Sequence, residues 1–160
     1  MTKFHVTIVM CLLMALLVPF TDILAVSEDT PLYTHFLYVA GHDGYVHFAI
    51  NAWSALVMHN LFRWYRVLAA YTFAVGVSFL GLTAQPMVGA SVFTCFFFGF
   101  TAPYLWKTEC TLVILTVALM LLTCILPGFA GIPHISAYLF GVLFSFLESY
   151  IRRIRHYLNE

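Results

Sequence analysis

Apolar residues in this chain gather into long runs that are separated by short polar segments. Each run is close to the ~20 residues that an α-helix needs to cross a bilayer. The pattern therefore predicts six transmembrane helices, joined by short loops, in a single domain that covers residues 1–160. The expected spans are 6–26, 44–62, 67–84, 87–105, 110–127 and 133–151.

The composition supports this prediction, since 62% of the residues are hydrophobic and only 9% are charged. Soluble domains do not have such a composition. We therefore expect an all-α, polytopic integral membrane protein with almost no mass outside the bilayer. The first apolar run has one alternative interpretation, a cleaved signal peptide, because Lys3 precedes it and Ala25 could precede a cleavage site.

Charges are unevenly distributed between the loops. If the N-terminus is cytoplasmic, six spans place all seven Lys and Arg residues on the cytoplasmic side, whereas the outer loops hold acidic residues such as Asp29 and Asp43. Cytoplasmic loops of membrane proteins are enriched in Lys and Arg, so both termini are expected in the cytoplasm. Near that side, Glu148 is expected to pair with Arg152 one turn further along the helix.

These features bear on partners and location. So small a membrane core is expected in a bacterial plasma (inner) membrane, as a multi-pass protein in contact with the lipid bilayer. No nucleic-acid partner is expected, and the sequence leaves the oligomeric state open.

Four polar side chains interrupt the outer ends of three spans. His47 lies about one turn inside span two and Asn51 one turn deeper, while His134 lies in the first turn of span six. Ser91 follows Pro86 by five residues, so a helix that starts at Pro86 would place Ser91 about 7 Å deep. Polar groups inside a bilayer are costly and usually functional. The topology therefore predicts one site in the outer leaflet.

The four side chains suit acyl-transfer chemistry. A serine hydroxyl becomes a nucleophile when a base takes its proton, and His134 is the candidate base for Ser91. The oxyanion of a tetrahedral intermediate needs hydrogen-bond donors, which the Asn51 amide, a His47 ring N–H and the Ser91 backbone N–H could supply. No Asp or Glu is placed to orient His134, so the sequence predicts a dyad.

Small residues favour close packing of spans four and six. Ser91, Cys95 and Gly99 recur every four residues on one face of span four, and Ala137 and Gly141 do so on span six. Stripes of small residues let membrane helices approach closely. We therefore expect these two spans to be in contact, as a hydrogen bond between Ser91 and His134 requires.

Together these residues resemble the rhomboid intramembrane serine proteases. That family has the pattern His-x4-His-x3-Asn in its second core helix, Gly-x-Ser in the fourth and His in the sixth. The corresponding residues are His42, His47 and Asn51, then Gly89-Ala90-Ser91, then His134. The resemblance extends over residues 30–150.

The resemblance implies a six-helix, rhomboid-like bundle in which Ser91 is the nucleophile and His134 the general base and acid. His47 and Asn51 would form the oxyanion hole with the Ser91 amide. Structural residues near the site would be His42, Gly89, Gly99 and Gly141.

It also implies that loop 128–133 covers the site and that span five is a gate for substrate. The substrates would be transmembrane segments of other membrane proteins, cleaved without a metal or cofactor.

The sequence departs from the family pattern near the proposed dyad. Val92 replaces a common glycine, Cys95 stands where many members have a tyrosine stacked on the catalytic histidine, and Ala137 replaces a glycine. Tyr33-Thr34 stands where the family has a Trp-Arg pair. These changes are compatible with a slow or narrowly specific enzyme. The alternative function is a catalytically silent, rhomboid-like membrane chaperone or adaptor that binds transmembrane helices.

Two further interpretations of the histidines fit less well. His35, His42 and His47 could suggest zinc, but neither His-Glu-x-x-His nor a similar zinc motif is present. Haem held between His47 and His134 would leave the Gly-x-Ser motif unexplained.

Overall fold

A computed structural model describes residues 2–27, 29–81, 86–125 and 130–159. Within these ranges the secondary structure is helical, apart from one isolated β-bridge between Val26 and Met87. The all-α prediction is thus confirmed for the described residues. The elements are α1 Lys3–Leu17, η1 Val18–Phe20, α2 Thr21–Leu24, α3 Leu32–Leu37, η2 Tyr38–Ala40, α4 Gly44–Met58, η3 His59–Leu61, α5 Trp64–Ser78, α6 Ser91–Leu105, α7 Cys110–Ile125 and α8 Gly131–Leu158.

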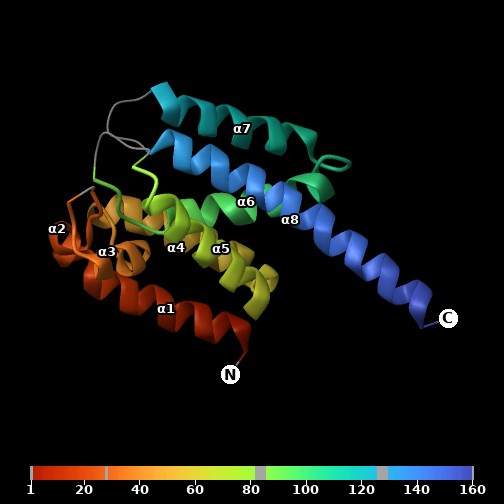
Figure 1. Ribbon diagram of the computed structural model, residues 1–160, viewed down its shortest axis with the longest axis horizontal. Helices are drawn as coiled ribbons and strands as arrows, with labels where there is room; N and C mark the ends of the chain where they lie inside the picture. Colours follow the sequence, from red (N-terminus) through yellow and green to blue (C-terminus); the bar gives the residue numbers. More distant parts are fainter. Residues whose placement is uncertain (1, 28, 82–85, 126–129, 160) are drawn as a thin grey trace.

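The helices form a layered bundle in which α6 and α8 lie side by side, with α7 on one side of this pair and α4 and α5 on the other (Figure 1). Helix α1 packs on α4 at the edge of the bundle, and the C-terminal part of α8 projects beyond the other helices (Figure 1). Each predicted span contains a helix. The ends of the spans predicted at 84 and 127, and the first two residues of loop 128–133, lie outside the described residues.

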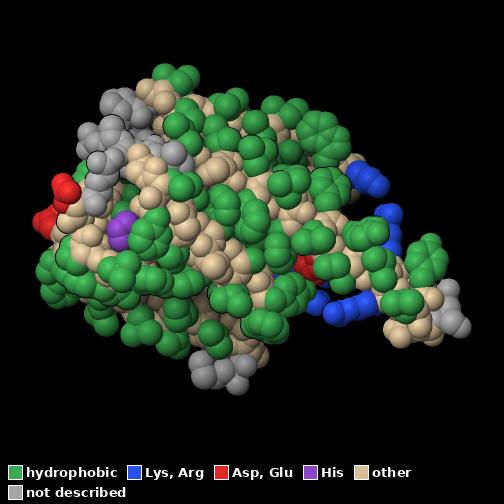
Figure 2. Space-filling model, viewed as in Figure 1, with side chains coloured by type: hydrophobic (Ala, Val, Ile, Leu, Met, Phe, Trp, Pro, Cys, Tyr) green, Lys and Arg blue, Asp and Glu red, His purple; other side chains and the backbone are tan. Residues whose placement is uncertain are grey.

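Two segments, Lys3–Leu24 and Gly131–Leu158, are long and apolar enough to cross a membrane. The apolar helices Ser91–Leu105 and Cys110–Ile125 are shorter. Hydrophobic side chains cover most of the face seen in Figure 2, Lys and Arg gather where α8 projects, and acidic side chains lie mainly at the opposite end. Large exposed apolar surfaces of this kind mark contact with a membrane or a partner.

The helices differ from the predicted spans and loops at three places. Helix α6 begins at Ser91 and not at 87, because Gly89 has a φ of +111° and Met87 pairs with Val26, so this segment is not helical. Helix α8 continues to Leu158, seven residues past 151, because its Arg-rich end favours a helix although it is too polar for a span. The predicted outer loop 27–43 contains α3 and η2.

Glycines allow α6 and α8 to pack closely against each other. A Cβ atom on Gly99 would collide with the carbonyl oxygen of Tyr138, and one on Gly141 would collide with the carbonyl oxygen of Phe96. Ala137 between them is fully buried. The two backbones are therefore in direct contact, which confirms the close approach predicted from the small-residue stripes.

A buried ion pair joins α5 to α8 near the projecting end. Glu148 accepts hydrogen bonds from Arg66 Nε at 2.8 Å and Nη2 at 2.7 Å, and from the Tyr65 hydroxyl at 2.9 Å. The predicted pair between Glu148 and Arg152 is also present. Arg66 lies over the ring of Phe100, with its guanidinium carbon 4.2 Å from the ring centroid. Glu148 thus neutralises a buried arginine.

Replacing Glu148 with glutamine is expected to lower the free energy of unfolding by about 3 kcal/mol, because the charge of buried Arg66 then loses its partner. Thermal unfolding of the protein in detergent, followed by circular dichroism, measures the effect. Glu109→Gln is the matched control, since Glu109 is exposed. Equal melting temperatures of the two variants would contradict the prediction.

Candidate active site

Ser91 and His134 meet at the heads of two adjacent helices. Ser91 is the first residue of α6 and His134 lies in the first turn of α8. The Nε2 atom of His134 is 2.8 Å from Ser91 Oγ, which confirms the predicted contact. His134 is buried and Ser91 is half-buried. Among the described residues no carboxylate forms a hydrogen bond with His134.

The predicted depth of Ser91 inside a helix is wrong. That depth assumed a helical rise from Pro86, whereas residues 87–90 precede α6 in non-helical backbone. The backbone N–H and C=O of Met87 pair with those of Val26, both at 2.8 Å, and the N–H of Gly89 donates to the Tyr38 carbonyl at 2.8 Å. Ser91 therefore projects from a helix N-terminus whose start is fixed by other segments.

Position 89 requires a glycine for two reasons: its backbone conformation and the close approach of the His47 ring. Its φ of +111° is costly for any residue with a Cβ atom. A Cβ there would also lie 2.7 Å from Cε1 of the His47 ring. The glycine of the Gly-x-Ser motif thus lets the imidazole of His47 lie against the strand-like segment that leads into Ser91.

Asn51 is tied to both α4 and α6. Its Nδ2 donates to the His47 carbonyl at 3.0 Å, and its Oδ1 accepts from the Thr94 hydroxyl at 3.1 Å. Because an amide group carries two N–H donors, one remains for another acceptor. His47 and Asn51 thus lie beside the N-terminal part of α6, which begins at Ser91, as the shared-site prediction requires.

Thr94 was not predicted as part of this site. A signal was available, since Thr94 follows Ser91 by three residues and so lies on the same face of a helix. Its hydroxyl donates a hydrogen bond to Asn51 Oδ1 and so fixes the orientation of the Asn51 amide. Hydroxyls in membrane helices usually bond their own backbone, which hides such a role in sequence.

His42 lies behind His47, outside the proposed spans. It is wholly buried, and its ring packs edge-on against those of His47 and Phe48 with centroids 5.4 Å apart in both cases. Burial, together with the nearby His47, lowers the pKa of His42 from 6.5 to about 4. A neutral imidazole at this place supports His47 by packing.

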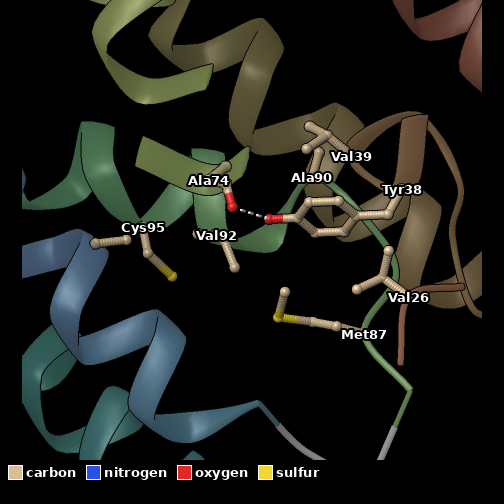
Figure 3. Close-up of a cluster of buried hydrophobic side chains, with 9 residues drawn as sticks. Val26, Tyr38, Val39, Ala74, Met87, Ala90, Val92 and Cys95 are labelled. Atoms are coloured by element: carbon tan, nitrogen blue, oxygen red, sulfur yellow. Dashed lines mark hydrogen bonds between the residues drawn. The ribbon is translucent and has the colours of Figure 1, made fainter. Parts of the chain in front are cut away.

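Three residues that depart from the rhomboid pattern, Val92, Cys95 and Ala137, belong to the core next to Ser91. Val92 and Cys95 lie in a buried cluster around the Tyr38 ring, whose hydroxyl donates to the Ala74 carbonyl at 2.8 Å (Figure 3). Cys95 Sγ is 3.4 Å from the sulfur of Met120 on α7. At position 95 the side chain therefore packs toward α7, and the cluster supports the first turn of α6.

The remaining histidine of the first outer segment is separate from the site. Nδ1 of His35 lies 3.0 Å from Ser78 Oγ, and its ring stacks on Phe79 with centroids 4.1 Å apart. Across the described ranges, no group of three or more His, Cys, Asp or Glu residues could hold a metal ion. His35 thus fastens α3 to the end of α5.

Searches of this chain against models of protein families, against curated proteins and against solved structures found no match.

Proposed function

We propose that this chain is an intramembrane serine endopeptidase of the rhomboid type that cleaves transmembrane segments of other membrane proteins. The observation that carries the proposal is the 2.8 Å contact between Ser91 Oγ and His134 Nε2, with His47 and Asn51 on the adjacent helix. Four polar groups lie close to the N-terminal turns of α6 and α8, among apolar helices, where each is costly unless it has a use.

The proposal includes six spans with both termini in the cytoplasm. It is supported by the separation of charge in Figure 2, with the basic side chains at the end where α8 projects. The sequence of α8 places Arg152, Arg153 and Arg155 after its apolar part. In this orientation Ser91 and His134 lie near the outer surface, on the side of the acidic loops.

Acylation would begin with attack of Ser91 Oγ on the scissile carbonyl carbon, while His134 Nε2 takes the hydroxyl proton. The carbonyl electron pair moves to oxygen, where the Ser91 backbone N–H, a His47 ring N–H and the remaining Asn51 N–H would donate hydrogen bonds. Each such donor lowers the barrier by about 3 kcal/mol.

Collapse of the intermediate breaks the C–N bond, and His134 returns its proton to the leaving amine. Water then attacks the acyl-enzyme with His134 as base, which releases the new carboxylate and restores Ser91. Every proton transfer in this proposed reaction passes through His134 Nε2.

Labelling by a fluorophosphonate tests this assignment without knowledge of the substrate. The purified protein should be labelled on Ser91, located by mass spectrometry, because the probe reacts with serines that a base activates. His134→Ala should remove the label. His59→Ala is the control, since His59 contacts the Leu56 carbonyl at the other end of α4. Equal labelling of parent and His134→Ala would overturn the dyad.

One observation favours the alternative, a membrane chaperone or adaptor without peptidase activity. An N–H of the Asn51 amide is already donated to the His47 carbonyl, which leaves a weaker oxyanion hole than two free donors would give. Under this alternative the parent would resist the fluorophosphonate, and Ser91→Ala would keep its full effect on partner proteins in cells.

A further inference from the structure

Helix α1 does not pack tightly on the bundle. A cavity of about 390 Å³ lies between α1 and the helices α4, α5 and α6. Val6, Met10 and Met14 of α1 line it at helical spacing, and Ala52 and Ala55 of α4 line the opposite wall. One face of α1 therefore borders empty space where helix packing would normally fill it.

Most polar groups along this cavity already have hydrogen-bond partners, and the exception is His42, whose two ring nitrogens have none among the described residues. The Thr7 hydroxyl donates to the Lys3 carbonyl at 3.0 Å, and the Thr94 hydroxyl donates to Asn51. Asn51 in turn donates to the His47 carbonyl. Apart from His42, the wall of the cavity is thus apolar or already hydrogen-bonded, so it favours an apolar occupant over a polar one.

Charge is confined to one end of the cavity. Lys3 is the only charged residue among the described residues that line it, and Lys3 is exposed. Its ammonium donates to the Asn60 carbonyl at 3.4 Å, a long contact that leaves most of its donors for other acceptors. Trp64, also exposed, lines the same end. Trp and Lys together are typical of the headgroup region of a bilayer.

We propose that this cavity holds one acyl chain of an anionic phospholipid, with the lipid phosphate at Lys3. From Lys3 to Met14 the rise along α1 is about 16 Å, close to half of the ~30 Å hydrocarbon core of a bilayer. The cavity thus matches one leaflet in length, in polarity and in the sign of charge at its mouth. Its other end touches Asn51 and Thr94, so the chain packs behind the proposed oxyanion hole.

This inference rests on the membrane setting of the proposed function and not on its peptidase chemistry. It is tested with the full chain in phosphatidylcholine vesicles that contain a trace of photoreactive lipid. The probes are phosphatidylglycerol and phosphatidylcholine, each with a diazirine in the same acyl chain. Mass spectrometry then locates the cross-links and measures their yield.

Phosphatidylglycerol should cross-link to Met10 and Ala52 about fivefold more than phosphatidylcholine, since one lysine near the surface favours an anionic lipid by that factor. Lys3→Gln should reduce the ratio to about one, whereas Lys107→Gln, at an exposed lysine away from the cavity, should leave it unchanged. Equal yields from both probes in the parent would overturn the choice of an anionic lipid.

A second pair of variants tests occupancy of the cavity itself. Ala55→Phe should suppress cross-linking at Met10 because its ring fills the cavity. Ala49→Phe, on the same helix but exposed and away from the cavity, should not. Unchanged cross-linking in Ala55→Phe would show that the lipid lies outside α1, and would overturn the proposal even if Ser91 reacts as expected. Lys3→Gln, at an exposed position, covers the case in which Ala55→Phe does not fold.

Discussion

Ser91→Ala is expected to reduce cleavage of a helix-destabilised transmembrane substrate by about 10⁴-fold or more, to the background of the assay. Ser91 Oγ, 2.8 Å from His134 Nε2, is the only protein atom that forms a covalent bond to the substrate carbonyl carbon in the proposed mechanism. Cleavage is measured with purified protein and substrate in the same detergent or vesicles, by gel shift and by mass of the products.

The control for this variant is Ser136→Ala. Ser136 lies in the first turns of α8 near His134, but its hydroxyl donates to the Pro133 carbonyl, so its loss should leave cleavage almost unchanged. Cleavage by Ser91→Ala at the parental rate would end the peptidase proposal. Because the two groups act as a unit, the double variant Ser91→Ala/His134→Ala should be no slower than Ser91→Ala alone.

Gly141→Ala is expected to destabilise the protein by about 3 kcal/mol or more, although it adds a single methyl group. The added Cβ would collide with the backbone carbonyl of Phe96, which cannot turn aside as a flexible side chain could. The helices α6 and α8 would have to separate. Thermal unfolding should shift down by about 10 °C, and the protein should elute less uniformly in size-exclusion chromatography.

The same substitution on α5 provides the control for this effect. A Cβ on Gly76 would meet no atom within 4 Å, and its backbone is helical. Gly76→Ala should therefore leave stability unchanged or raise it by about 0.5–1 kcal/mol, since alanine favours a helix. If Gly141→Ala and Gly76→Ala have the same melting temperature, the contact between α6 and α8 is not as close as described.

Sequence reasoning succeeded where local pattern and topology decide the outcome. The contact of Ser91 with His134 follows from two helices that start on the same side and carry small residues on facing stripes. Gly99 and Gly141 were found by four-residue spacing alone. The pairing of Glu148 with Arg152 is equally local, since the two residues are one helical turn apart.

It failed where distant segments fix one another. The start of α6 depends on the pairing of Met87 with Val26, two residues that no periodicity relates. Glu148 binds Arg66, which lies 82 residues earlier, so the i,i+4 partner concealed the buried one. The cavity beside α1 could not be predicted either, because an apolar helix face has the same sequence pattern whether or not another helix packs against it.

His134 and Glu148 belong to one unbroken helix, α8, and are fourteen residues, or about 21 Å, apart along it. The helix is anchored at both places, by Ser91 at one and by Arg66 at the other. If α8 shifted along its axis by about 1 Å relative to Arg66, the imidazole of His134 would move by the same amount. Release of Glu148 should therefore slow turnover at the far end of α8, although no residue of the proposed dyad has been replaced.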